Sequence, residues 1–132
     1  MNIKQSIIEQ LIQHARADAP VEACGYLAET DGVVNAIFRL KNADASPEHF
    51  SFDPAEQFAA VRQMRVVGTR LRAVYHSHPA TPARPSPEDI RLANDPALSY
   101  VIVSLAGAQP DVKSFRIRDS QVAAEPLKII ED

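Results

Sequence analysis

Residues 70–89 read RLRAVYHSHPATPARPSPED, and this stretch decides how the chain folds. Apolar side chains at Leu71, Ala73 and Tyr75 alternate with other residues, and this alternation predicts a strand. Four prolines follow and predict a stiff loop, because proline fixes one of the two soft backbone angles. The sequence Ser-Pro-Glu-Asp at 86–89 then predicts the start of a helix, so the order here is strand, rigid loop, helix.

Helices and strands alternate along the rest of the chain. An amphipathic helix is expected to begin near Ile3 and to end at the Ala-Asp-Ala-Pro run of 17–20, since the residue before a proline leaves helical geometry. Asp53, followed by a proline, starts a second helix that buries Phe58 and ends at Gly68. The remaining expected elements are strands at 22–29, 33–40, 49–52, 71–78, 99–105 and 112–118, a further strand within 121–130, and a helix at 86–94.

Helices interspersed among strands favour an α/β protein built on a mixed sheet over a barrel or a helical bundle. The chain has 132 residues and no break in composition, which predicts a single domain spanning 1–132. A chain of this length buries roughly two-thirds of its unfolded surface, so a core can form without disulfides.

Charge and hydropathy exclude several partner classes. The formal net charge of −3 argues against nucleic acid as the main partner, because domains that grip phosphates carry a positive excess. The longest apolar runs, such as YVIVSLA at 100–106, are far shorter than the ~20 residues that span a bilayer. The N-terminus lacks a basic head before an apolar stretch, and a single cysteine indicates no secreted disulfide framework. We therefore expect a cytoplasmic enzyme or binding domain.

Two of the four histidines stand at the end of the strand quoted above. Side chains two residues apart on a strand point to the same side, so His76 and His78 converge while Ser77 faces away. Two neutral imidazoles suit a zinc, copper or iron ion. Asp89 is the best candidate for a third ligand, because the loop can fold its helix back toward the strand end. A fourth position would stay open for water.

Glu22 is the carboxylate that surface solvation explains least, because it is isolated in the apolar stretch APVEACGYL. Burying an unpaired carboxylate costs several kcal/mol, so a buried glutamate usually has a partner or a task. One task would be to take the proton of a metal-bound water. A pairing with an arginine such as Arg72 is the structural alternative.

These residues together closely resemble the signature of the JAMM (MPN+) metallopeptidases: Glu22, His76-Ser77-His78-Pro79, and Ser86-x-x-Asp89 after seven intervening residues. The resemblance covers every motif position, and the order of helices and strands is similar across most of the chain. It implies a JAMM (MPN, cytidine-deaminase-like) fold, in which a mixed curved sheet is flanked by helices.

The same resemblance implies residue roles and a substrate class. His76, His78 and Asp89 would bind Zn²⁺, Glu22 would be the general acid/base, and Ser86 would steady the water or the developing oxyanion. The segment 42–53 resembles that of small bacterial members that act on ubiquitin-like sulfur-carrier proteins. The implied function is a zinc-dependent, isopeptidase-type metallopeptidase that hydrolyses an amide at the C-terminal tail of such a carrier.

Other interpretations of the same residues stay open. Two histidines and one carboxylate also form the facial triad of non-haem iron oxygenases, and a non-catalytic MPN interaction module would share the fold. A Cys24–His pair would give a thiol hydrolase, although buried cysteine more often fills apolar space. Ser86 and Asp89 also match a helix capping box.

Several further residues have no assigned task. The basic cluster of Arg62, Arg65, Arg70 and Arg72 either stabilises a helix C-terminus or forms a docking patch for an acidic carrier domain. His14, on the polar side of the first helix, and His49 are expected to be surface or packing residues. The oligomeric state stays open.

Overall fold

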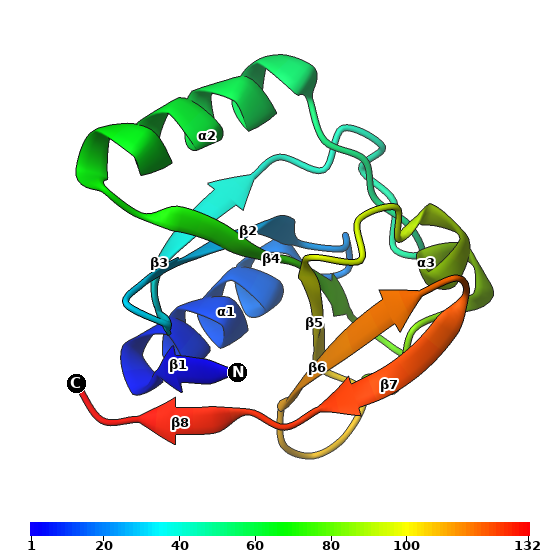
Figure 1. Cartoon of the computed structure of the whole chain (residues 1–132). Coiled ribbons are helices and arrows are strands. Elements are labelled where there is room, and N and C mark those ends of the chain that lie inside the picture. The colour runs from blue at the N-terminus through cyan, green and yellow to red at the C-terminus, as the bar shows by residue number, and fades with distance from the viewer.

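Eight strands form one mixed sheet with three helices packed around it (Figure 1). The computed structural model describes all 132 residues. The strand order is β7-β6-β5-β4-β2-β3-β1-β8. The elements are β1 (Asn2–Lys4), α1 (Gln5–Asp18), β2 (Cys24–Thr30), β3 (Val33–Leu40), α2 (Pro54–Val67), β4 (Arg70–His78), α3 (Pro87–Leu92), β5 (Ser99–Ser104), β6 (Asp111–Arg118), β7 (Gln121–Glu125) and β8 (Lys128–Ile130).

The sheet is mixed because it contains both parallel and antiparallel neighbours. Strands β4 and β5 run parallel and are joined through α3, whereas β2 is antiparallel to both β3 and β4. The sheet also curls, because β7 and β8 lie at its opposite ends and yet only Pro126 and Leu127 separate them in sequence. The backbone of Lys128 donates to the carbonyl of Met1 at 2.9 Å, which fixes this junction. The expected α/β fold with a mixed, curved sheet is therefore confirmed.

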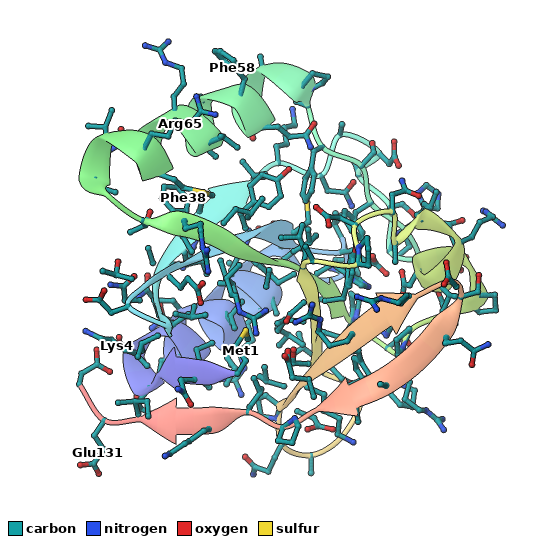
Figure 2. All side chains as sticks on the ribbon, viewed as in Figure 1. Met1, Lys4, Phe38, Phe58, Arg65 and Glu131 are labelled. Carbon is teal, nitrogen blue, oxygen red and sulfur yellow. The ribbon has the colours of Figure 1, made fainter.

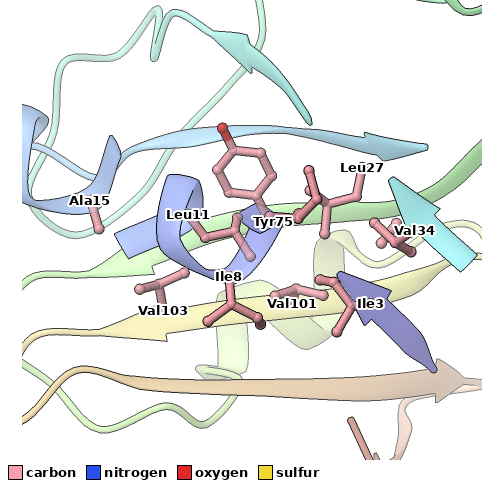
Figure 3. Close-up of a cluster of buried hydrophobic side chains, with 11 residues drawn as sticks. Ile3, Ile8, Leu11, Ala15, Leu27, Val34, Tyr75, Val101 and Val103 are labelled. Carbon is pink, nitrogen blue, oxygen red and sulfur yellow. The ribbon is translucent and has the colours of Figure 1, made fainter. Parts of the chain in front are cut away.

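Alternate residues of the central strands supply the two faces of the sheet. Tyr75 and Leu27 are buried under α1 together with the apolar face of that helix (Figure 3). Tyr26 belongs to a second cluster, in which Ala60 and Met64 of α2 pack on the other face. Since neighbouring residues of a strand point to opposite faces, the residue after Tyr75 must point away from α1. The α1 face is thus core, whereas the other face is only partly covered by α2 and presents the residue after Tyr75.

The second helix has the ends that its sequence predicts. The side chain of Asp53 accepts a hydrogen bond from the backbone of Ala55 at 3.2 Å and so caps the first turn. Gly68 closes the helix with φ of 79°, a left-handed conformation in which glycine is favoured. The expectation that Phe58 is buried is wrong, because 67% of its surface is exposed on the outer side of α2 (Figure 2). The face that packs on the sheet is set instead by Ala60 and Met64.

Three expected boundaries also need correction. The first helix starts at Gln5, because Ile3 lies in β1 and pairs with β3 and β8. The expected strand at 49–52 is a loop with a single bridge between Asn42 and Phe52. The expected strand within 121–130 is two strands, β7 and β8, which Pro126 interrupts.

His14 is a packing residue, one of the two roles expected for it, but its expected place on the polar side of the helix is wrong, because it is buried. Its Nδ1 lies 2.6 Å from the hydroxyl of Tyr75, and its Nε2 lies 3.0 Å from the carboxylate of Asp18. These contacts tie α1 to the middle of β4, the strand that carries His76. No helix in the structure is both long enough and apolar enough to cross a membrane.

Replacing Gly25 by alanine is expected to destabilise the sheet strongly. A Cβ at this position would collide with the carbonyl of Phe38 and would lie within 2.7 Å of the Tyr75 ring. Forcing extra carbon into a packed core costs about 1–3 kcal/mol or more. Urea unfolding should show this loss for Gly25→Ala. The control is Gly107→Ala, whose Cβ would meet only an ordinary contact at 3.6 Å; equal stability of the two variants would contradict the prediction.

Candidate metal centre

The carboxyl end of β4 places His76 and His78 on the face of the sheet opposite α1. Both side chains are buried, and their Nε2 atoms lie 3.1 Å apart. The strand is held on both sides here, because His76 pairs with Cys24 of β2 and His78 pairs with Ser104 of β5. The two imidazoles therefore converge as their spacing predicts, on a part of the backbone that has little freedom to move.

Ser77 points the other way and holds the neighbouring strand. Its hydroxyl accepts a hydrogen bond of 2.7 Å from the backbone of Ala23, and its own backbone donates to the Ala23 carbonyl at 2.9 Å. This pair of bonds fixes the chain directly after Glu22 against the strand that carries the histidines.

Asp89 reaches the histidines from the first turn of α3. Its Oδ2 lies 3.2 Å from Nε2 of His76 and 3.1 Å from Nε2 of His78. The predicted capping box is present, because Ser86 Oγ accepts from the Asp89 backbone at 3.0 Å and the Ser86 backbone donates to Oδ2 at 2.9 Å. The capping role and the contact with the histidines coexist, since one carboxylate oxygen takes part in both.

The proline-rich loop also orients His78. Nδ1 of His78 donates to the carbonyl of Pro82 at 2.8 Å, and a carbonyl can only accept. In the neutral ring this leaves Nε2, the atom nearest Asp89, without a proton and able to bind a metal. Burial lowers the pKa of His78, but the hydrogen bonds to Asp89 and Pro82 prevail and raise it. Burial likewise opposes the ionised form of Asp89, and the hydrogen bonds from the two histidines still hold the pKa of Asp89 well below its usual range.

The donor set fits a tetrahedral metal ion. The three candidate ligand atoms lie within 4.8 Å of one another, and the separations at the shared oxygen are 3.1–3.2 Å. Ligand atoms about 2.0–2.2 Å from a tetrahedral zinc would stand roughly 3.3 Å apart. Two imidazole nitrogens and one carboxylate oxygen also leave one of four positions for water or substrate.

Glu22 lies two residues before the start of β2, and not within the strand that the sequence predicts from 22 to 29. Its side chain is 3% exposed, and Oε1 has no hydrogen-bond partner. Burial raises the pKa of Glu22 to about 8, against a smaller opposing effect of His78. The pairing with Arg72 considered above does not form, because Arg72 instead contacts Glu29 at 3.4 Å and Glu125 at 3.1 Å.

The side chain of Asn42 organises the loop that holds Glu22. Asn42 is buried and its Nδ2 donates to the carbonyl of Glu22 at 3.1 Å. The backbone of Glu22 in turn donates to the carbonyl of Ser46 at 2.9 Å. The other partners of the Asn42 side chain are the carbonyls of Ser46 and His49 and the backbone amides of Asp44 and Ser51. Asn42, which the sequence did not single out, thus fixes the carbonyl of Glu22 directly and its backbone N–H through Ser46.

Phe50 is a second neighbour of the site that sequence reasoning missed. Its ring stacks on the imidazole of His76, with centroids 4.7 Å apart and planes inclined by 25°. The signal in the sequence was an isolated aromatic pair, Phe50 and Phe52, in an otherwise polar segment. His49 is exposed, as expected for a surface residue, and contacts Asp44 at 3.1 Å.

Neither Cys24 nor the arginine cluster contributes to this centre. Cys24 is fully buried with its thiol 3.6 Å from the Leu40 carbonyl, and burial raises the pKa of the thiol to about 12. A nucleophilic thiolate is therefore disfavoured. Arg70 and Arg72 form ion pairs with Glu29, so they do not form one free patch with the arginines of α2.

Comparison with known proteins places the chain in a family. The family model described as prokaryotic homologs of the JAB domain matches residues 4–118. This chain belongs to that family. It is 36% identical over 132 residues to the CysO-cysteine peptidase of Mycobacterium tuberculosis, covering 98% of this chain and 90% of the relative.

Two further proteins extend this comparison. A probable TtuB-protein conjugate cleaving protease of Thermus thermophilus is 32% identical over 123 residues, covering 92% of this chain and 79% of that one. The solution structure of DSY2949 from Desulfitobacterium hafniense superposes with a TM-score of 0.91 at 47% identity, covering 99% of this chain and 93% of the other. The fold and the family expected from the motif are confirmed.

Replacing Glu22 by glutamine should change the pH dependence of stability in the metal-free protein. Folding raises the pKa of the Glu22 carboxyl from 4.5 to about 8. Between these two pH values the unfolded chain loses this proton and the folded protein keeps it, so the free energy of unfolding falls as pH rises. The wild type should therefore lose stability relative to Glu22→Gln as pH rises from about 4.5 to 8, by several kcal/mol in total. Urea unfolding in the presence of a chelator measures this difference at each pH. A constant difference between the two proteins would contradict the buried, unpaired state of Glu22.

Replacing Asn42 by alanine should loosen the loop at 41–53. The change removes the side-chain groups that make five contacts with the loop and with Glu22. It leaves the buried carbonyl of Glu22 without this partner, at a cost of about 1–3 kcal/mol. Hydrogen exchange read by mass spectrometry should show faster exchange at Glu22 and in the loop, together with a lower urea midpoint. Asn94→Ala, at an exposed position, is the matched control. Unchanged exchange in Asn42→Ala would show that the loop is held by other contacts.

Proposed function

We propose that this chain is a zinc-dependent peptidase that hydrolyses the amide bond at the C-terminal tail of a ubiquitin-like or sulfur-carrier protein. The observation that carries the proposal is the convergence of His76, His78 and Asp89 beside the buried, unpartnered carboxylate of Glu22. The names of the two relatives support the substrate class, since one is a peptidase for CysO-cysteine and the other cleaves TtuB-protein conjugates. Both are matched over most of this chain.

In this proposal His76, His78 and Asp89 hold the zinc ion, and Glu22 moves the proton. A zinc ion held there would make its bound water nucleophilic near neutral pH and would polarise the scissile carbonyl. Oε1 of Glu22, which has no other partner, accepts the proton of the attacking water and then delivers it to the leaving nitrogen. The stacked ring of Phe50 and the Pro82 carbonyl keep the two imidazoles in place during this exchange.

Ser86 stabilises the developing negative charge in this mechanism. Its Oγ accepts a hydrogen bond from the backbone of Asp89, so the hydroxyl is oriented while its own proton stays free to donate. A hydrogen-bond donor placed at the oxyanion that forms from the scissile carbonyl lowers the activation free energy by about 2.7–4 kcal/mol. Ser86 therefore serves the reaction without binding the metal.

The proposal accounts for Glu22, which the alternatives leave without a task. An iron oxygenase needs the two histidines and the aspartate but has no use for a second, buried carboxylate. Metal analysis of protein purified without added metal separates the two, because stoichiometric iron would favour the oxygenase. A chain that binds no metal at neutral pH would instead be an interaction module. The cytoplasmic location stays a prediction.

The exchange Glu22→Gln should lower turnover by about 10²–10⁴-fold, which is the usual contribution of a general acid or base. Zinc content should stay at one per chain, since Glu22 is not among the three ligands. The assay incubates the zinc-loaded protein with conjugates of ubiquitin-like proteins and weighs the products by intact mass spectrometry. Glu48→Gln, an exposed carboxylate in the adjacent loop, is the control. Undiminished turnover in Glu22→Gln would refute the proton-transfer role.

A further inference from the structure

A pocket of about 430 Å³ opens beside the candidate metal centre. It shares His76 and Asp89 with that centre, and Phe50 forms part of its wall. Its floor is the same face of the sheet, with Tyr100 of β5 and Ile117 of β6. Specific ligand pockets have volumes of about 300–1,000 Å³, so this one can hold the side chain and flanking backbone of a bound peptide.

The wall of the pocket is apolar and not covered by the rest of the protein. Leu92 on α3 lines it with 55% of its surface exposed, and Leu98 lines it from the loop before β5. Opposite them, Phe50 and Phe52 belong to the loop that Asn42 organises. Covering this apolar surface would remove it from water, which favours a complex. The complementary ligand is therefore an apolar side chain.

The charged residues of the pocket are all acidic. Glu88, Asp89 and Asp95 line it, and no lysine or arginine does. Arg91 contacts Glu88 at 3.7 Å but lies outside the pocket. Asp89 is a candidate metal ligand, so Glu88 and Asp95 are the negative charges that remain in the metal-loaded protein. An acidic side chain entering the pocket would lose hydration and meet these two like charges. The pocket is built to accept an apolar residue and to reject an acidic one.

The position of Glu22 indicates which half of the substrate enters the pocket. Neither Glu22, His78 nor Ser86 lines it, so it extends from the centre on the His76 side. In the proposed mechanism Glu22 delivers a proton to the leaving nitrogen, which places the amine half of the substrate near Glu22. The acyl half, which is the tail of the carrier, then runs past His76.

We infer that this pocket binds an apolar side chain of the carrier's C-terminal tail, on the acyl side of the scissile amide. The inference rests on the proposed function and adds a specificity determinant to it. The pocket would fix the direction of the tail through the site. It would also discriminate between carriers, because tails with an acidic residue at the matching position would bind poorly.

Synthetic tail peptides test the inference. Each peptide has small residues throughout except at one of the four positions before the scissile amide, which carries leucine, phenylalanine, alanine or aspartate. At one position the zinc-loaded protein should show a kcat/KM at least about tenfold higher for leucine or phenylalanine than for aspartate. A second set varies only the residue after the scissile amide and should show no such preference.

Variants at Leu92 locate the preference in the pocket. Leu92→Asp should raise KM for the leucine peptide about tenfold, with little change in kcat. Leu92→Lys should raise the ratio of kcat/KM for the aspartate peptide to kcat/KM for the leucine peptide. Ile129→Asp is the matched control, because Ile129 is 50% exposed on β8 and does not line the pocket. Fluorescence anisotropy of labelled peptide on metal-free protein gives a readout that is independent of turnover, and Leu92→Asp should weaken binding there too.

The outcomes separate the two proposals. Cleavage of no peptide or conjugate by protein that holds zinc would overturn the proposed function. Cleavage at equal rates whatever the acyl-side residue would overturn the pocket assignment alone. It would also be overturned if only the residue after the scissile amide affected the rate. The same holds if Leu92→Asp and Ile129→Asp changed the preference equally.

Discussion

Everything in the site depends on one convergence, in which the Oδ2 atom of Asp89 meets the Nε2 atoms of His76 and His78. These three side chains are mostly buried, so their mutual contacts replace water that each would otherwise bind. The fold allows the arrangement because it fixes each partner separately: a paired central strand holds the histidines, and the capping box of α3 holds the aspartate. Neither device needs the other to form.

The alternation of β4 connects this centre to the core of the protein. Tyr75 is buried against α1 and contacts His14, while the next residue, His76, faces the site. A shift of one residue in the register of β4 would exchange these roles and would place the tyrosine where the candidate metal ligands now lie. Gly25 enforces the register, because only a residue without a Cβ fits beside the Tyr75 ring and the Phe38 carbonyl. Packing on one face therefore sets the geometry on the other.

Local signals in the sequence predicted the parts of the molecule that depend on local spacing. The His76–His78 pair needs only the two-residue period of a strand, and the capping box needs only four consecutive residues, so both were predictable. The error at Ile3 arose because β1 runs directly into α1. Ile3 fits the helical spacing of the apolar residues that follow it, and a strand of three residues is too short to show its own alternation. The partner of His14 was not predictable, since it is Tyr75, 61 residues away in sequence.

The loop at 41–53 shows why the second half of the site could not be predicted in this way. It has no helix or strand of its own, and the buried amide of Asn42 makes five of the contacts that hold it, which depend on the complete fold. Through that amide the same loop fixes the backbone of Glu22 and brings Phe50 against His76. A single polar side chain thus couples Glu22, the proposed proton-transferring group, to the wall of the pocket. The geometry that would select a substrate and the geometry that would activate water therefore cannot change independently.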